Sequence, residues 1–164
     1  RGAGGVEPVR LVLIAGGGGV GLGGTAWVDG DFPPGAMGAI GAGIDLASGK
    51  TLQAVSANAV IDEHPDTGHA VSGLTIPYWD ELLELASRAF ELTGLKYQGV
   101  DIVIDQIKGP LILELNARPG LAIQIANGAG LRTRLNAVND CLASLSAPKD
   151  RLDFARERFG EKIG

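Results

Sequence analysis

The clearest helical pattern in the chain lies near its middle. Four apolar residues recur there at the spacing of one helical face: Trp79, Leu83, Ala86 and Phe90. Pro77 precedes them and suits the start of a helix, while Gly94 follows them in the place of a C-terminal cap. The pattern predicts an amphipathic helix between these two residues, with Trp79 as its anchor in the core.

Short apolar runs between turn residues predict the strands. The predicted strands are Arg10–Ala15, Gly38–Leu46, Thr51–Asn58, Tyr97–Asp105 and Pro110–Asn116. The turns at residues 47–50 and 106–109 make hairpins of the strands that flank them. A second helix is predicted from about Leu131 to Leu145. Hairpins beside helices, without strict alternation, predict an α+β fold with a mostly antiparallel sheet and flanking helices.

The last two predicted strands bring two acidic residues onto one face. Alternation places Asp101 on the face opposite its apolar neighbours. If residues 106–109 form a four-residue loop, Asp105 pairs with Pro110. The same register then sets Asp101 directly across from Glu114, and this pair is the most suggestive chemistry in the chain.

Two carboxylates opposite each other on an antiparallel pair repel. Asn116 adds a carboxamide oxygen one residue pair further along the same face. Oxygen ligands with few protein carboxylates are typical of Mg²⁺, which usually also contacts nucleotide phosphates. The sequence is consistent with two interpretations of this face: a divalent cation site and a solvated acidic sheet face. Asp105 is expected to be a solvated turn residue, and Leu113, on the other face, a core residue.

The composition excludes several classes of protein. The chain has 164 residues, 26 of them glycine, with 45% apolar residues and a net charge of −5. This is not the composition of a disordered chain, and the glycines lack the period of collagen. An acidic chain without a basic stripe argues against a nucleic-acid partner. Residues 11–28 are uncharged but too rich in glycine to predict a membrane span. The single cysteine, Cys141, predicts a structural thiol in a cytoplasmic protein.

Two glycine motifs resemble nucleotide-binding loops. Residues 16–21 match the G-x-G-x-x-G pattern, but residues 22–34 lack the helical periodicity that this motif requires. A glycine-rich strand pair or loop is the preferred interpretation, and a dinucleotide-binding domain is the less favoured one. Gly49-Lys50-Thr51 ends like a P-loop, but Ile44 stands where its first glycine belongs. We therefore interpret Lys50 as a residue of a hairpin turn.

Two histidines lie in a polar loop that contains proline and glycine. His64 and His69 are five residues apart, and no third metal ligand is apparent nearby in the sequence. A loop stabilised by Asp66 and Thr67 is the preferred interpretation, ahead of a metal site.

The acidic hairpin also carries a family resemblance. Asp101, followed by Glu114-x-Asn116 and then Arg118-Pro-Gly120, resembles the metal-binding signature of the ATP-grasp superfamily. Further segments resemble its alpha-L-glutamate ligase-related branch: residues 43–46, 64–69, 79–82 and 123–128. The resemblance covers roughly residues 38–146.

The resemblance implies an ATP-dependent ligase. Such enzymes bind ATP between two α+β subdomains, phosphorylate a carboxylate and let an amine attack the acylphosphate, which gives an amide-like bond. It implies that Asp101, Glu114 and Asn116 hold Mg²⁺, with Mn²⁺ possible, and that Asn116, Arg118 and Gly120 contact the nucleotide. Arg118 would be the catalytic residue at the phosphate or acylphosphate, with a surface salt bridge as its alternative. Gly120 and residues 122–130 would shape the acceptor side.

The resemblance also predicts how the chain is organised. Residues 1–37 would be a divergent glycine-rich segment, residues 38–146 the C-terminal ATP-grasp subdomain, and residues 147–164 a charged tail. Similar proteins carry an Arg and an Asn-Leu-His-x-Gly segment where Asp31–Gly35 stands here. The expected partners are the N-terminal half of the same protein, a small-molecule or peptide carboxylate and an amine such as an amino acid. The alternative is a non-catalytic binding module that keeps the fold.

Overall fold

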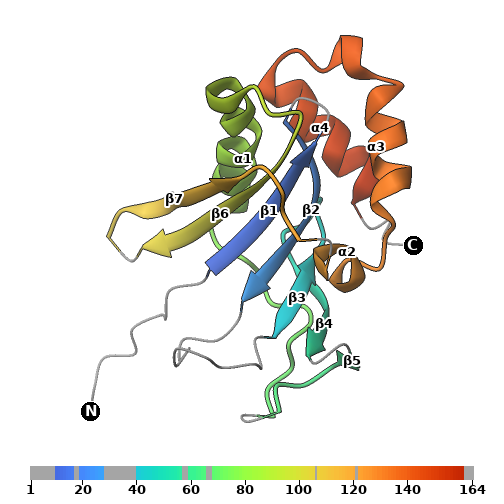
Figure 1. Cartoon of the computed structure of the whole chain (residues 1–164). Coiled ribbons are helices and arrows are strands. Elements are labelled where there is room, and N and C mark those ends of the chain that lie inside the picture. Colours follow the sequence, from blue (N-terminus) through green and yellow to red (C-terminus); the bar gives the residue numbers. More distant parts are fainter. Residues whose placement is uncertain are drawn as a thin grey trace.

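The strands form a single antiparallel sheet. The computed structural model describes residues 10–16, 19–27, 40–56, 59–65, 68–105, 107–120 and 122–160. The strands are β1 (Arg10–Gly16), β2 (Val20–Trp27), β3 (Gly41–Ile44), β4 (Thr51–Ser56), β5 (Ala59–Ile61), β6 (Tyr97–Asp105) and β7 (Gly109–Asn116). Their order in the sheet is β5-β4-β3-β2-β1-β6-β7 (Figure 1). All neighbouring pairs are antiparallel.

Helices flank this sheet, so the predicted α+β class is confirmed. They are α1 (Trp79–Thr93), α2 (Ala122–Ala126), α3 (Leu131–Asn139), a short 3-10 turn (Leu142–Ser144) and α4 (Pro148–Phe159). The helix predicted up to Leu145 therefore ends earlier and gives way to the 3-10 turn. No helix among the described residues is long and apolar enough to cross a membrane.

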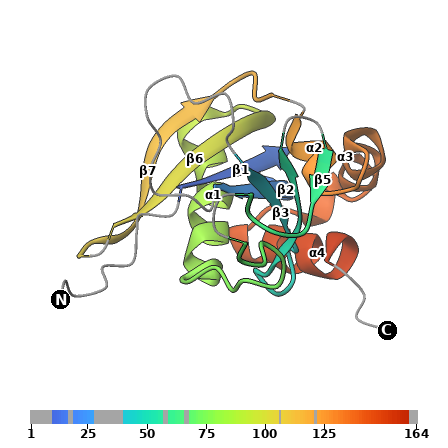
Figure 2. The same cartoon turned by 90° about the horizontal axis from the view of Figure 1, so that it is seen from below.

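Helix α1 is the predicted amphipathic helix and covers one face of the sheet (Figure 2). Leu82, Leu83 and Ala86 are buried in one core cluster with Val100 and Ile102 of β6. The helix ends at Gly94, whose left-handed backbone lets its N–H bond the carbonyl of Phe90. This burial of one apolar stripe is the main force that holds the helix on the sheet.

Trp79 is the anchor that the sequence predicts. Its side chain is buried, and its indole Nε1 donates a hydrogen bond to the carbonyl of Leu46, at 3.1 Å. The indole also packs against Gly49, in the turn between β3 and β4. The first residue of α1 therefore connects this helix to the turn between β3 and β4.

Helix α4 lies beside α1 and contacts β2. Arg151 is buried, donates to the carbonyls of Ser87, Leu145 and Ser146, and pairs with Glu91 at 3.0 Å. A buried arginine needs this full set of partners to offset its loss of hydration. The stretch predicted as a charged tail thus contributes a packed helix.

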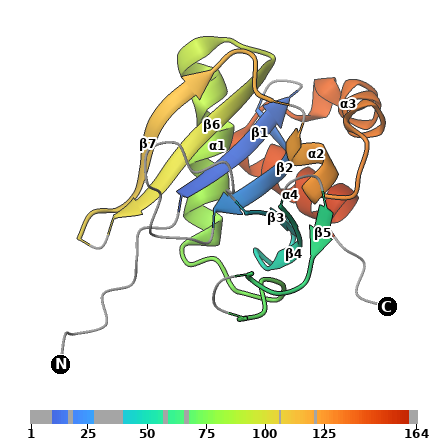
Figure 3. The same cartoon turned by 60° about the horizontal axis from the view of Figure 1, so that its bottom comes forward.

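Helix α2 lies on the other face of the sheet, where Figure 3 shows it in front of the strands and α1 and α4 behind them. It contacts β2, β3 and β4. A Cβ built on Gly43 would overlap the carbonyl oxygen of Ala126, so the helix backbone rests directly on this glycine. Cross-strand partners share a face, and the register runs from Gly43 through Thr25 and Val12 to Asp101. Asp101 and α2 therefore share one face.

Candidate functional site

The β6–β7 hairpin carries the candidate site. Asp101 pairs with Glu114, as the sequence predicts, although the turn differs from the expected one. Asp105 pairs with Gly109 instead of Pro110, because the loop is one residue shorter than expected. A bulge then adds Leu113 to β7 and restores the predicted register at the acidic pair.

The turn of this hairpin is built around Gly109. Its φ of 72° is left-handed, which suits the glycine that directly follows the turn. An oxygen of Asp105 accepts the backbone N–H groups of Ile107 and Lys108, at 2.9 and 2.8 Å. These bonds lower the pKa of Asp105 below its usual value, with the Lys108 charge contributing less. Asp105 is thus the turn residue that the sequence predicts.

The prediction that Leu113 lies in the core is wrong. This residue is 59% exposed, because it is the extra residue of the bulge on the outermost strand. Strict alternation along β7 predicted a buried position, and an added residue interrupts that alternation. No local pattern in the sequence marks the bulge.

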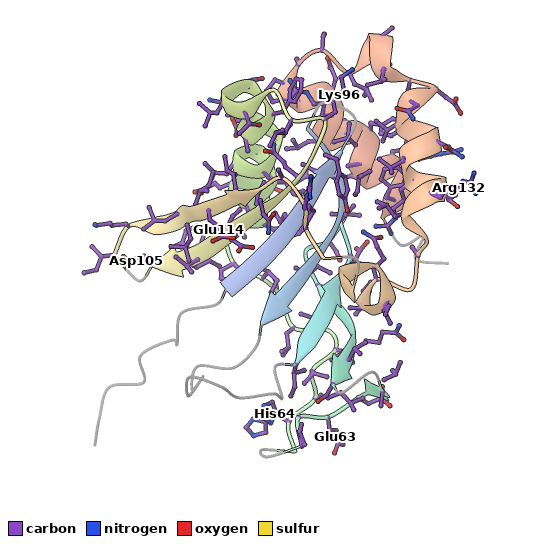
Figure 4. All side chains as sticks on the ribbon, in the orientation of Figure 1. Glu63, His64, Lys96, Asp105, Glu114 and Arg132 are labelled. Atoms are coloured by element: carbon purple, nitrogen blue, oxygen red, sulfur yellow. The ribbon has the colours of Figure 1, made fainter. Side chains whose placement is uncertain are left out.

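The two acids differ in burial. Asp101 is 7% exposed, and Glu114 is exposed on the outer strand. Directly paired positions of an antiparallel sheet place their Cβ atoms ~5 Å apart. Figure 4 shows Glu114 on the β6–β7 hairpin, at the other end of the molecule from Glu63 and His64. The pair is thus one inner and one outer carboxylate on the same face.

Asn116 lies one row away from this pair. It pairs with Gly99 on β6 and is exposed. Its Oδ1 accepts the backbone N–H of Arg118 at 2.9 Å, which turns the chain at the end of β7. The Arg118 guanidinium is exposed and forms no ion pair with a described residue, so its alternative role in a surface salt bridge is not borne out there.

Pro119 was not predicted as part of the site. It is buried, and a Cβ built on Gly99 would lie only 2.9 Å from the Pro119 Cβ. The loop that holds Arg118 therefore folds back over the sheet face. A glycine inside a strand is the sequence signal for such a close approach, and Gly99 has that position. Gly120, by contrast, borders open space.

The donor set fits a hard divalent cation. Asp101, Glu114 and Asn116 offer two carboxylates and one amide oxygen on one face of the hairpin. Mg²⁺ is bound by few protein carboxylates and completes its shell with water or phosphate oxygens. Among the described residues no group of three or more His, Cys, Asp or Glu could hold a metal, so such a site depends on outside oxygens. The ligand roles of these residues remain predictions.

The glycine motifs lack the structures that they need to bind nucleotides. β1 ends at Gly16 and β2 begins at Val20, so a hairpin replaces the helix that a dinucleotide motif requires. Gly49 and Lys50 follow a turn closed by Asp45, whose carboxylate accepts the Ser48 N–H at 2.9 Å. The preferred interpretation of a glycine-rich strand pair is confirmed, while Lys50 lies just after the turn, in a bridge with Thr75.

The histidine loop is closed by its own backbone. His64 is buried, its N–H bonds the carbonyl of His69, and Gly68 bonds the carbonyl of His64, both at 2.8 Å. The prediction that Asp66 and Thr67 stabilise this loop lies outside the described residues.

A family comparison covers most of this structure. A model of the family described as "Sugar-transfer associated ATP-grasp" matches residues 22–140. No curated protein and no solved structure matches the chain. The matched range includes every predicted site residue: Asp101, Glu114, Asn116, Arg118 and Gly120. The resemblance to the ATP-grasp superfamily is therefore confirmed, and the chain belongs to the sugar-transfer associated ATP-grasp family.

Proposed function

We propose that this chain is the C-terminal half of an ATP-dependent carboxylate–amine ligase of the alpha-L-glutamate ligase-related branch. The ligase would phosphorylate a carboxylate on a small molecule or peptide. An amine, such as that of an amino acid, would then displace phosphate from the acylphosphate and form an amide-like bond. The partner for this half would be the N-terminal half of the same protein, in the cytoplasm.

One observation carries this proposal. Asp101 faces Glu114 across an antiparallel pair, and Asn116 lies one row further on the same face. Like charges in this position cost stability, and a cation bound between the two carboxylates would offset that cost. The family match supports ATP as the ligand that would bring this cation.

Each residue of the site has a distinct part in the proposed function. Asp101, Glu114 and Asn116 would hold Mg²⁺, with Mn²⁺ as the alternative ion. The bound cation supplies neutralisation of the charge that develops on a transferred phosphoryl group. Arg118 would bind phosphate or acylphosphate oxygens, for which its planar guanidinium has matching geometry. Gly120 borders open space, in which the nucleotide would lie.

The family description supports one class of substrate. The family is described as associated with sugar transfer, so we infer that the carboxylate or the amine belongs to a sugar-bearing molecule. Helix α2 shares the sheet face of Asp101, and residues 122–130 would border the acceptor. The assignment of residues 122–130 to the acceptor side rests on the position of α2 on this face.

A non-catalytic module that keeps the fold is the second candidate. The observation that favours it is the lack of any Lys or Arg between Arg10 and Lys50. Phosphate sites ordinarily recruit cationic side chains, and Arg118 would be the main one on this face. Binding of Mg-ATP without turnover in the full-length protein would distinguish this candidate from the ligase.

The test is Mg²⁺-dependent ATP binding by the full-length protein, compared between wild type and Glu114→Gln. Loss of one charged ligand is expected to weaken binding by about 10- to 100-fold. Glu157→Gln, an exposed acid on α4, is the matched control and keeps wild-type affinity. The metal-free Glu114→Gln protein should be more stable by about 0.2–1 kcal/mol, because the opposed charges are gone. Unchanged Mg²⁺-dependent binding would refute the assignment.

A further inference from the structure

The position of Arg118 depends on its backbone. Its guanidinium is exposed and forms no ion pair with a described residue. Two contacts hold the backbone around it: the Asn116 Oδ1 accepts the Arg118 N–H, and Pro119 packs on Gly99. An arginine that must meet a ligand in a defined place needs such support from its main chain.

Gly99 makes the second contact possible. A Cβ at this position would lie 2.9 Å from the Pro119 Cβ and 3.7 Å from the Asn116 Cβ. Its backbone is not left-handed, so any residue could adopt the conformation. Gly99 lies in β6, between β1 and β7, where glycine weakens a strand. The lack of a side chain at this position is thus a matter of space for Pro119.

The geometry points to Gly99 as a positioning residue: its empty side-chain position seats Pro119 and thereby fixes Arg118 beside the row that holds Asp101 and Glu114. This inference rests on the proposed function for the phosphate-binding role of Arg118. Asn116 joins the two parts, because it pairs with Gly99 and also accepts the Arg118 N–H. The support is therefore continuous from the strand to the arginine.

The inference separates the two halves of the site. In Gly99→Ala, the added methyl group displaces Pro119 and moves Arg118. Asp101 and Glu114 keep their register, because they lie in the next row of this face. We expect Mn²⁺ affinity, measured by electron paramagnetic resonance, to stay within about twofold, while Mg-ATP affinity falls about tenfold through the lost arginine contact.

The control is a second sheet glycine. Gly21→Ala makes the same substitution on β2, where the new Cβ meets ordinary contacts at 3.7 Å and beyond. Gly21→Ala should leave Mn²⁺ and Mg-ATP affinity unchanged. A loss of Mg-ATP affinity as large as in Gly99→Ala would show that any added methyl group in the sheet suffices, and would overturn the specific role of Gly99.

Exchange of the Arg118 amide proton, followed by nuclear magnetic resonance, gives a readout without ATP. Exchange should accelerate in Gly99→Ala and stay unchanged in Gly21→Ala, because only the first displaces the bond to Asn116. Unchanged exchange in Gly99→Ala would overturn the inference. If wild type binds no Mg-ATP, the proposed function fails, while this readout still decides the role of Gly99.

A double-mutant cycle makes the link to Arg118 direct. Gly99→Ala should add nothing to the affinity loss of Arg118→Ala, because both remove the same contact. Multiplicative losses would overturn the inference. If Gly99→Ala does not fold, Gly99→Ala with Pro119→Gly removes the overlap. That folded protein should retain weak Mg-ATP binding and fast Arg118 exchange, and native values for both would overturn the inference.

Discussion

The β1–β2 and β6–β7 hairpins use the same irregularity for different ends. Each carries a bulge that adds one leucine, Leu22 on β2 and Leu113 on β7. Leu22 is fully buried in the main core cluster, and Leu113 is 59% exposed. The first hairpin has a strand on both sides, whereas β7 forms the edge of the sheet. A bulge inside the sheet serves packing, and a bulge at the edge sets the register of the acidic pair.

The glycines of the two hairpins differ in the same way. Gly21 lies among core side chains of α1 and α4, on the face away from the acidic pair. Gly99 lies under Pro119, on the face of Asn116. Gly21, the last glycine of the motif that resembles a nucleotide-binding loop, thus lies in the packed core, while Gly99 borders the candidate site. Glycine count is therefore a poor guide to function in this chain.

Truncating the two bulge leucines gives the largest expected contrast. Leu22→Ala should cost about 2–5 kcal/mol of unfolding free energy, because it leaves a cavity in the core. Leu113→Ala, the matched control on the exposed bulge, should change stability by less than about 0.5 kcal/mol. Urea unfolding of both variants measures the difference. Equal losses would mean that the β7 bulge is also part of the packed core.

A smaller effect of opposite sign is expected at Gly21. A small apolar cavity of about 10 Å³ borders this residue and is lined by Leu83, Ala86 and Ala155, among others. An alanine methyl group would fill it and also restrict the unfolded chain, so Gly21→Ala should gain about 0.4–1 kcal/mol. Thermal unfolding checks this, with Gly99→Ala as the destabilised counterpart. A loss of stability in Gly21→Ala would show that the β1–β2 glycines are needed for more than close packing.

The sequence predicted the structure well where a regular local pattern determined it, as in a helix or a hairpin. The spacing from Trp79 to Phe90 predicted α1, and the assumed loop of the last hairpin predicted the pairing of Asp101 with Glu114. The predicted pairing is correct only because two errors in register cancel. The loop is one residue shorter than assumed, and the unforeseen bulge adds one residue to β7. Local patterns do not encode bulges, because an added residue is stabilised by neighbours far away in the sequence.

Long-range contacts are the other part that the sequence leaves open. The packing of Pro119 against Gly99 and of α2 against Gly43 depends on which strands become neighbours. Pairing of β1 with β6 joins segments more than eighty residues apart, and no periodicity predicts it. The identities of the candidate ligands were readable from the sequence, while the support of Arg118 became visible only in the fold.

The smallest expected effect concerns Asp105, the acid in the turn of the β6–β7 hairpin, and it depends on pH. Its pKa is lowered by the N–H groups of Lys108 and Ile107 that its carboxylate accepts. A lowered native pKa means that the unfolded chain binds more protons, so stability rises with pH across this range. The contribution is fully present above the ordinary value of 3.8 and is lost as pH falls through the native value.

Asp105→Asn is therefore expected to flatten the acid limb of a stability-against-pH curve slightly, with little change at neutral pH, since asparagine also accepts backbone N–H groups in turns. Urea midpoints measured from pH 7 down to pH 3 test this, with pH 7 as the neutral reference. Glu157→Gln, which replaces an exposed acid on α4, is the control and should leave the acid limb as it is in wild type. An acid limb that is equally steep with and without the Asp105 carboxylate would show that this carboxylate does not stabilise the β6–β7 turn.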